Sequence, residues 1–257
     1  MKARKRFGQH FLHDPAVLDR IAHAVAPGAN DALVEIGPGR GALTRVLLES
    51  DARTLDAIEI DRDLAPRLRE QFASDARFHV HEADALEFDF TALARERGAS
   101  RLRIVGNLPY NISTPLLFHL LKHVSVIDDM HVMLQREVVN RIAARPGYGD
   151  YGRLTVMLAP WLEAEALFEV GPGAFQPPPK VWSAVARLSV RREPAFAVSP
   201  RFAAVVASAF SHRRKTLRNA LKGLATAAQI ESCDVDPNAR PETLAPEAFN
   251  RLAQSLG

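Results

Sequence analysis

Short apolar runs alternate with amphipathic stretches along the first two-thirds of the chain. Apolar runs that end at turn signals predict buried parallel strands, and apolar residues at helical spacing predict the helices between them. We expect strands at residues 32–36, 55–60, 77–81, 102–105, 126–135, 154–158, 166–170 and 181–190. We expect helices at residues 42–50, 62–72, 114–123 and 136–144. This alternation predicts an α/β fold, a Rossmann-like sheet with helices on both faces. The alternating 181–190 run is typical of a strand near a sheet edge.

The pattern changes after residue 192. Residues 194–200 are an expected linker, and the apolar positions that follow have the i, i+3, i+4 spacing of a helix: Phe202, Val205, Val206, Ala209 and Phe210. The remainder is rich in proline and acidic residues and predicts one or two short helices. The sequence therefore predicts two domains, an α/β domain over residues 1–192 and a small all-helical domain over residues 193–257.

Composition narrows the class of protein. Apolar residues make up 47% and charged residues 25% of the 257 residues, as in an ordinary globular protein. No apolar run approaches the roughly 20 residues of a membrane span, and the N-terminus lacks a signal-peptide core, so we expect a cytoplasmic protein. The single cysteine excludes an internal disulfide and a cysteine-based metal site. His119 and His123 share a helix face without a third ligand, so we expect no metal site.

Charge is distributed unevenly, although the net charge is only +3. Four basic residues and no acidic ones lie within residues 2–6, and six basic and no acidic ones lie within residues 201–222. Arg214, Arg218 and Lys222 are spaced by four and predict a basic stripe on one helix. Two such segments indicate a polyanionic partner, either nucleic acid or a membrane surface. A solvated basic helix face is the alternative.

A glycine-rich turn, Gly37-Pro38-Gly39-Arg40-Gly41, follows the first expected strand. A strand, a glycine turn and a helix form the first unit of a nucleotide-binding α/β fold. The spacing is G-x-G-x-G rather than the dinucleotide pattern, and Glu35 would repel a pyrophosphate. A carboxylate there suits a cationic amino-acid end, such as the methionine part of S-adenosylmethionine. Both features disfavour an NAD-dependent dehydrogenase.

Carboxylates follow at the ends of the next two expected strands. Glu59 lies 18 residues beyond Gly41, about where this fold holds a ribose hydroxyl pair. Asp61 shares its face, and we assign it to the cap of helix 62–72. Asp84 could accept a hydrogen bond from an adenine amine, or it could be a turn aspartate. The parallel topology puts Gly37, Glu59, Asp84 and Asn107 on one rim.

The turn Gly106-Asn107-Leu108-Pro109-Tyr110 follows the fourth expected strand. A planar amine could be held there by the Asn107 oxygen and a backbone carbonyl while its ring lies on Tyr110. The alternative is a plain strand-to-helix turn, with Asn111 or Ser113 as helix cap. Further along, Phe175 precedes three consecutive prolines. It could be an exposed ring that stacks on a base or a side chain of the core.

Six segments together resemble the ribosomal RNA adenine dimethyltransferases of the KsgA/RsmA type, and the similarity covers most of the chain. The segments are 7–12, 34–41, 57–61, 83–86, 106–113 and 175–183. These enzymes use S-adenosylmethionine to dimethylate two adjacent adenines near the 3′ end of small-subunit ribosomal RNA. The resemblance implies the same reaction, the small ribosomal subunit precursor and its rRNA as partner, neither DNA nor a membrane, and a monomer. A ribosome-assembly factor and a large-subunit rRNA methyltransferase remain alternatives.

The resemblance also implies site residues. Gly37 would line the methionine part of the cofactor, Glu59 would hold the ribose and Asp84 the adenine amine. The full cofactor set is His10, Leu12, Gly37, Glu59, Asp84 and Asn107. The catalytic set is Asn107, Leu108, Pro109, Tyr110 and Phe175, with Tyr110 and Phe175 stacking on a flipped base. The RNA-binding set is Arg213, Arg214, Lys215, Arg218 and Lys222. One position departs from the family, which usually has Asn where this chain has His10.

Overall fold

The computed structural model describes residues 9–212 and 214–256 and divides into two compact units. The sheet unit comprises Met1–Val139 and Ala164–Val190, and the helical unit comprises Asn140–Glu163 and Arg191–Gly257. The division differs from the expected single break after residue 192. Residues 140–163, which we had assigned to the α/β domain, belong to the helical unit.

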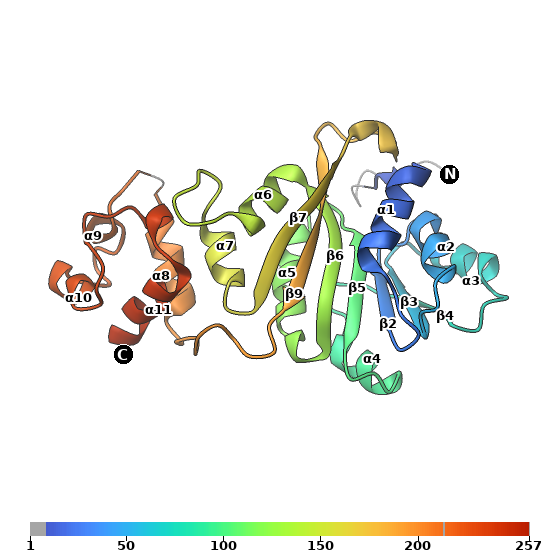
Figure 1. Cartoon of the computed structure of the whole chain (residues 1–257), viewed down its shortest axis with the longest axis horizontal. Coiled ribbons are helices and arrows are strands. Elements are labelled where there is room, and N and C mark those ends of the chain that lie inside the picture. Colours follow the sequence, from blue (N-terminus) through green and yellow to red (C-terminus); the bar gives the residue numbers. More distant parts are fainter. Residues whose placement is uncertain (1–8, 213, 257) are drawn as a thin grey trace. The chain divides into compact units, whose positions relative to one another are not determined.

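A seven-stranded sheet has the strand order β4-β3-β2-β5-β6-β9-β7 (Figure 1). Five strands run parallel: β2 (Ala32–Ile36), β3 (Thr54–Glu59), β4 (Phe78–Glu82), β5 (Leu102–Asn107) and β6 (Ile127–Gln135). Strand β9 (Ser183–Val190) is antiparallel to β6, and β7 (Leu162–Val170) and β4 are the two edge strands. The strand order reverses between β2 and β5. Such a switch point leaves a crevice at the strands' carboxyl ends, where this class of fold binds ligands.

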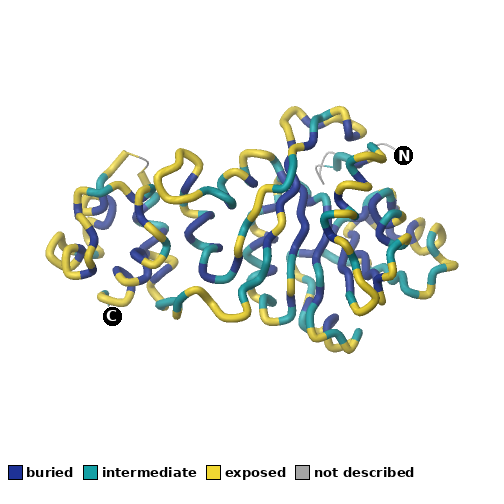
Figure 2. The backbone as a smooth tube through the Cα atoms, viewed as in Figure 1, coloured by how far each residue is buried: buried dark blue, intermediate teal, exposed yellow. Residues whose placement is uncertain are grey.

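Helices cover both faces of the sheet (Figure 1). On one face lie α1 (Pro15–Val25), α2 (Ala42–Leu48) and α3 (Ala65–Gln71); α1 and α2 contribute to a buried cluster that includes Val105 and Met133. Alternation turns Ile104 and Val132, both fully buried, to the other face. That face is covered by α4 (Phe90–Glu96) and α5 (Ser113–Leu121), and α6 (Arg136–Ala143) follows β6. The strands of the sheet accordingly trace a largely buried path in Figure 2.

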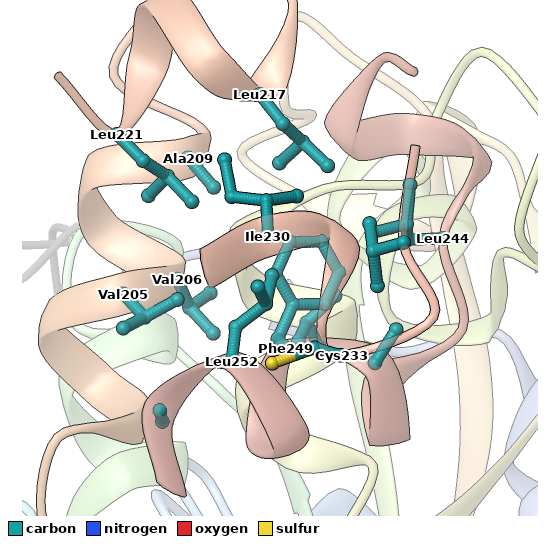
Figure 3. Close-up of a cluster of buried hydrophobic side chains, with 14 of the residues drawn as sticks. Val205, Val206, Ala209, Leu217, Leu221, Ile230, Cys233, Leu244, Phe249 and Leu252 are labelled. Carbon is teal, nitrogen blue, oxygen red and sulfur yellow. The ribbon is translucent and has the colours of Figure 1, made fainter. Parts of the chain in front are cut away.

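The helical unit has its own hydrophobic core (Figure 3). Its helices are α7 (Arg153–Leu158), α8 (Phe202–Ala209), α9 (Leu217–Ala220), α10 (Ala227–Glu231) and α11 (Pro246–Ser255). The expected helical positions Phe202, Val205, Val206 and Ala209 are all buried, which confirms the amphipathic pattern of α8. The Tyr151 hydroxyl donates to the Leu244 carbonyl at 2.7 Å and ties the segment before α7 into this core.

The position of β9 near a sheet edge is confirmed, since only β7 lies beyond it. Two other expectations about elements were wrong. Residues 154–158 are the helix α7 rather than a strand, because Thr155 caps the Gly152 amide and Val156 packs into the helical core. Helix α9 is a single turn, so Arg214 and Lys222 lie beyond its ends and no basic stripe runs along one helix. Short apolar segments do not distinguish strand from helix by periodicity alone.

Candidate active site

A pocket of about 260 Å³ opens at the carboxyl ends of the parallel strands. It is lined by Gly37 after β2, Glu59 at the end of β3, Asp84 after β4 and Asn107 at the end of β5. The structure therefore brings together the four rim positions that the parallel topology predicted. Aliphatic and aromatic side chains form most of the remaining wall, as in ligand pockets generally.

The glycine turn closes one side of the pocket. Gly39 has φ +59°, a conformation that side chains rarely adopt, and a Cβ there would lie 2.9 Å from the Phe11 ring. Its amide donates to the Glu59 carboxylate at 3.1 Å. Gly106 matters for a different reason, because a Cβ there would lie 2.5 Å from the Ile36 carbonyl oxygen. Only glycine allows β5 and β2 to approach this closely at the switch point.

Glu59 organises the next part of the wall. Its carboxylate accepts from the Gly39 amide and, at 2.9 Å, from the Asp61 amide. Burial raises the pKa of Glu59. Asp61 does not cap α3, which begins at Ala65; it accepts from the Asp63 amide and from the Gln9 side chain. Of the two carboxylates, Glu59 is therefore the one that lines the pocket.

Glu35 lies deeper, beneath the glycine turn. Its side chain is buried, and the Thr44 hydroxyl donates to it at 2.6 Å. Burial raises the pKa of Glu35 to about 7, so the carboxyl is only partly ionised at neutral pH. It lines a smaller cavity of about 40 Å³ together with Leu12 and Gly37. A cationic group in that cavity would favour the carboxylate form of Glu35. The role of Glu35 toward a cationic ligand remains a prediction.

Asp84 is a turn aspartate that also lines the main pocket, and its expected contact with an adenine amine remains a prediction. One carboxylate oxygen accepts from the Leu86 amide at 2.9 Å, which makes it a turn aspartate. The side chain also lines the main pocket next to Ala85 and Leu86. A turn aspartate that faces a cavity is fixed in position and keeps acceptor capacity, because an ionised carboxylate offers about four lone-pair sites.

The turn after β5 presents polar groups in a fixed orientation. The Asn107 carboxamide donates through Nδ2 to the His10 carbonyl at 2.9 Å, which leaves Oδ1 as its acceptor. The Leu108 amide donates to the Met133 carbonyl at 3.1 Å, and the Leu108 side chain is buried. The carbonyls of Pro109 and Tyr110 accept from the Ile112 amide and the Ser113 hydroxyl. The Leu108 carbonyl is therefore the main-chain acceptor that we assign to the pocket. Neither Asn111 nor Ser113 caps α5.

Tyr110 is held at both ends. Its hydroxyl lies 2.6 Å from the Ser183 hydroxyl, the first residue of β9, and burial raises its pKa. The His10 ring stacks against it, with ring centroids 5.8 Å apart and an interplanar angle of 27°. Sequence reasoning missed Ser183 as a site residue, although it closes the last of the segments that carry the resemblance. Its fully buried hydroxyl fixes the position of the tyrosine hydroxyl.

Phe175 is not the exposed ring that we had expected. It is 2% exposed and belongs to the short strand β8 (Phe175–Gln176), which pairs antiparallel with β1 (Phe11–Leu12). Leu12 lies directly opposite Phe175, and both join the core beneath α1. The alternative of a core-packing phenylalanine is therefore correct, and the structure gives Phe175 no free face for stacking.

His10 lines the main pocket and the smaller cavity. Its Nδ1 lies 2.8 Å from the Pro177 carbonyl, its ring lies on Tyr110, and its own carbonyl holds Asn107. The imidazole thus faces the target turn, and its expected cofactor contact stays a prediction. Residues 2–8 of the basic arm, including Phe7 and Gly8, lie outside the described residues.

The predicted RNA-binding residues are at the surface of the helical unit. Arg214, Lys215, Arg218 and Lys222 are all exposed, whereas Arg213 lies outside the described residues. The described part of the chain shows no group of three or more His, Cys, Asp or Glu that could hold a metal ion. His119 and His123 instead bond to the Phe88 carbonyl and the Thr91 hydroxyl. No helix within residues 9–212 and 214–256 has the length and apolarity needed to cross a membrane.

Three features on one rim define the class of Rossmann-like methyltransferases. They are the glycine turn, the acidic residue at the end of β3 and the Asn-Leu-Pro-Tyr turn. The family model described as "Ribosomal RNA adenine dimethylase" matches residues 1–257, and the chain belongs to this family. It is 55% identical to "Ribosomal RNA small subunit methyltransferase A" of Pseudomonas aeruginosa, over 99% of this chain and 95% of that protein.

Solved structures agree with this assignment. A dimethyladenosine transferase from Plasmodium falciparum superimposes with a TM-score of 0.80 at 26% identity, covering 95% of this chain and 96% of that one. The 23S rRNA methyltransferase ErmE superimposes with a TM-score of 0.75 at 29% identity, covering 96% of this chain and 99% of that one. The fold expected from the sequence, a Rossmann-like methyltransferase sheet, is confirmed.

Proposed function

We propose that this protein is an S-adenosylmethionine-dependent enzyme that dimethylates the exocyclic amines of two adjacent adenosines near the 3′ end of small-subunit ribosomal RNA. Family membership and the 55% identity to a small-subunit rRNA methyltransferase support the reaction and the substrate. The observation that carries it is the fixed Asn107 carboxamide, whose Oδ1 is an acceptor for a planar amine beside the glycine turn.

The residues around the main pocket fit the cofactor. Glycines at 37 and 39 leave its wall free of side chains, and Glu59 and Asp84 offer carboxylate acceptors for a ribose and an adenine amine. Glu35, Leu12 and Gly37 line the smaller cavity, which suits the cationic methionine end. When bound, S-adenosylmethionine supplies an electrophilic methyl group. His10 stays in the proposed set because it lines both cavities.

The target turn would orient the amine. The adenine is unstacked into the pocket at a cost of a few kcal/mol. Asn107 Oδ1 and the Leu108 carbonyl accept its two N–H groups, Pro109 shapes the turn and the adenine ring lies on Tyr110. This holds the nitrogen lone pair out of conjugation and in line with the methyl group. Positioning should supply much of the rate, and no strong base is needed because the nitrogen becomes acidic only as the methyl arrives.

The remaining parts of the proposal concern the partner. Exposed Arg214, Lys215, Arg218 and Lys222 would contact phosphates, together with Arg213, so RNA binding should weaken steeply with salt. The partner is the precursor of the small ribosomal subunit, bound by a monomer in the cytoplasm. Neither DNA nor a membrane has a place in the reaction.

A large-subunit target is the second candidate, because the chain is also similar to ErmE, a 23S rRNA methyltransferase. The identity to that enzyme is 29%, against 55% to the small-subunit methyltransferase, and this difference favours the small subunit.

The test is transfer of tritium from labelled S-adenosylmethionine to small ribosomal subunits that lack these methyl groups. Large subunits and DNA run in parallel, and nucleosides are analysed afterwards. We expect label only in dimethyladenosine from small subunits. Label in large subunits would favour the second candidate. No transfer to any substrate, with cofactor still bound, would favour an assembly factor without methylation.

A further inference from the structure

Two large apolar side chains next to the target turn are unusually exposed. Trp182 is 48% exposed and Val181 is 43% exposed, although the next residue, Ser183, is fully buried. Tryptophan carries a large apolar surface that proteins normally cover, so an exposed indole beside a pocket indicates a contact with a partner.

Trp182 is held in place rather than left loose. Its ring packs over Gly171, where a Cβ would come 3.7 Å from the indole. Its carbonyl accepts from the Arg136 amide at 2.9 Å, and the Arg136 guanidinium carbon lies 5.9 Å from the centre of the ring. The indole is therefore anchored by the Gly171 backbone and by Arg136, while 48% of the residue stays exposed.

The sheet register relates Trp182 to the target turn. Ser183 pairs with Gln135 on β6, and Asn107 pairs with Met133 on the same strand. Ser183 also contacts the Tyr110 hydroxyl. Trp182 is thus displaced from Asn107 by about three residues along the strands, or about 10 Å, and by two strands across the sheet, or roughly another 10 Å. The combined separation of about 14 Å is on the scale of one to two nucleotides in an extended strand.

The charge around Trp182 suits a polyanion. Lys180 is exposed two residues away, and the Arg136 guanidinium lies over the ring. Arg136 also pairs with Glu169 at 3.3 Å, but both side chains are about half exposed, and such pairs contribute little energy. The guanidinium can therefore contact a phosphate at small cost.

The geometry points to Trp182 as a stacking platform for a base that flanks the target adenine, with Lys180 and Arg136 contacting the adjoining phosphates. This inference rests on the proposed function, since it requires an extended RNA strand at the pocket. Aromatic residues beside cationic ones are how proteins bind single-stranded nucleic acid without reading its sequence. The platform would set the position of the strand so that one adenine enters the pocket.

The first test compares Trp182→Ala and Trp182→Phe with wild type on small subunits, with Tyr148→Ala as a control. Tyr148 is 67% exposed but belongs to the helical unit. We expect Trp182→Ala to raise KM about ten-fold, because loss of one base–aromatic stack has roughly this effect, while kcat, thermal stability and S-adenosylhomocysteine binding change little. Trp182→Phe should recover part of the loss, and Tyr148→Ala should match wild type. An unchanged KM for Trp182→Ala would overturn the inference.

The second test removes the base instead of the side chain. Small subunits are reconstituted with RNA that carries an abasic nucleotide next to the target adenine, on each side in turn. On one side, the missing base should raise KM for wild type about as much as Trp182→Ala does, and should have no further effect on the variant. Additive losses on both sides would mean that Trp182 contacts something else, such as a ribosomal protein.

A third measurement separates this inference from the proposed function. The chain has two tryptophans, so Trp161→Phe leaves Trp182 as the only indole. Its fluorescence should be quenched on titration with single-stranded RNA, whether or not methyl transfer is detected. If wild type transfers no methyl group but quenching occurs, the proposed reaction is wrong, whereas the inference that Trp182 stacks on a base is supported. Methyl transfer without quenching would contradict the inference about Trp182 and leave the proposed function intact.

Discussion

The two walls of the pocket are assembled in different ways. In the cofactor wall, which comprises the 37–41 turn with Glu35, Glu59 and Asp84, the three carboxylates accept hydrogen bonds from residues at most 20 positions away in sequence. The target wall, which comprises the 106–110 turn with His10 and Ser183, is held by bonds that span 73 and 97 positions. The cofactor wall forms with its own βα units. The target wall requires the N-terminal arm, β5 and β9 to meet.

We expect this difference to separate cofactor binding from methyl transfer. Changes in the cofactor wall should alter cofactor affinity or the stability of the glycine turn. Changes in the target wall should alter turnover while the cofactor still binds. The following substitutions test that division, beginning with the largest expected effect.

Asn107→Ala removes the acceptor for the target amine. We expect kcat to fall about 10²–10³-fold, because positioning of the nucleophile is lost, while the Kd for S-adenosylhomocysteine changes less than about three-fold. Single-turnover methyl transfer and calorimetric titration measure the two quantities. Asn111→Ala, an exposed carboxamide four residues on, is the matched control. Normal turnover by Asn107→Ala would refute the role assigned to it.

Glu35→Gln tests the buried carboxyl of the cofactor wall. The folded-state pKa is raised from 4.5 to about 7, so its contribution to stability is complete below about pH 4.5 and is lost as the pH rises through 7. The variant does not titrate, so its free energy of unfolding relative to wild type should rise between pH 5 and pH 8. The rise should reach at most about 3 kcal/mol, at 1.36 kcal/mol per pKa unit.

Urea unfolding at pH 5, 6, 7 and 8 measures this difference for Glu35→Gln. Thr44→Val supplies the comparison, because loss of the Thr44 hydroxyl removes a hydrogen bond that lowers the pKa of Glu35. The free energy of unfolding of Thr44→Val should therefore fall over a higher pH range than that of wild type. A pH-independent difference between Glu35→Gln and wild type would show that Glu35 is ionised throughout.

Glu59→Gln tests the carboxylate that joins the glycine turn to the proposed ribose site. We expect the Kd for S-adenosylhomocysteine to rise about 10–100-fold, because hydrogen bonds to a charged group are worth roughly 1.5–3 kcal/mol. At saturating cofactor, kcat should stay within a few-fold of wild type. Asp61→Asn is the control, since that carboxylate bonds to Gln9 and the Asp63 amide. A large fall in kcat with unchanged affinity would contradict the division into two walls.

Tyr110→Phe and Ser183→Ala test the bond that links the target turn to β9. Each single variant should lower stability by about 1 kcal/mol or more, because it leaves a partly or fully buried hydroxyl unpaired. In the double variant the losses should not add, with a coupling energy of about 0.5–1.5 kcal/mol. Chemical denaturation of the four proteins measures it. Strict additivity would mean that the bond contributes nothing.

The same division explains what the sequence could predict. The order of strands and helices, the rim of Gly37, Glu59, Asp84 and Asn107, and the buried face of α8 follow from local patterns and parallel topology, and the structure confirms them. Local periodicity could not foresee that Phe175 pairs opposite Leu12, because that pairing joins residues far apart in the chain.

The remaining errors have related causes. Whether a short apolar segment such as 154–158 becomes strand or helix is decided by its tertiary neighbours, here the helical core. The bond between Tyr110 and Ser183 likewise joins two segments far apart in the chain, and the local sequence pattern of neither segment indicates the other.

The fixed orientation of Asn107 has a consequence for when the reaction stops. Because Nδ2 is committed to the His10 carbonyl, the Asn107 carboxamide presents only an acceptor to the amine. In the proposed reaction, adenosine satisfies two acceptors, monomethyladenosine satisfies one, and dimethyladenosine has no N–H left to give. Each transfer thus weakens the hold on its own product. The fixed orientation of the Asn107 carboxamide therefore favours release of the adenosine after two methyl transfers.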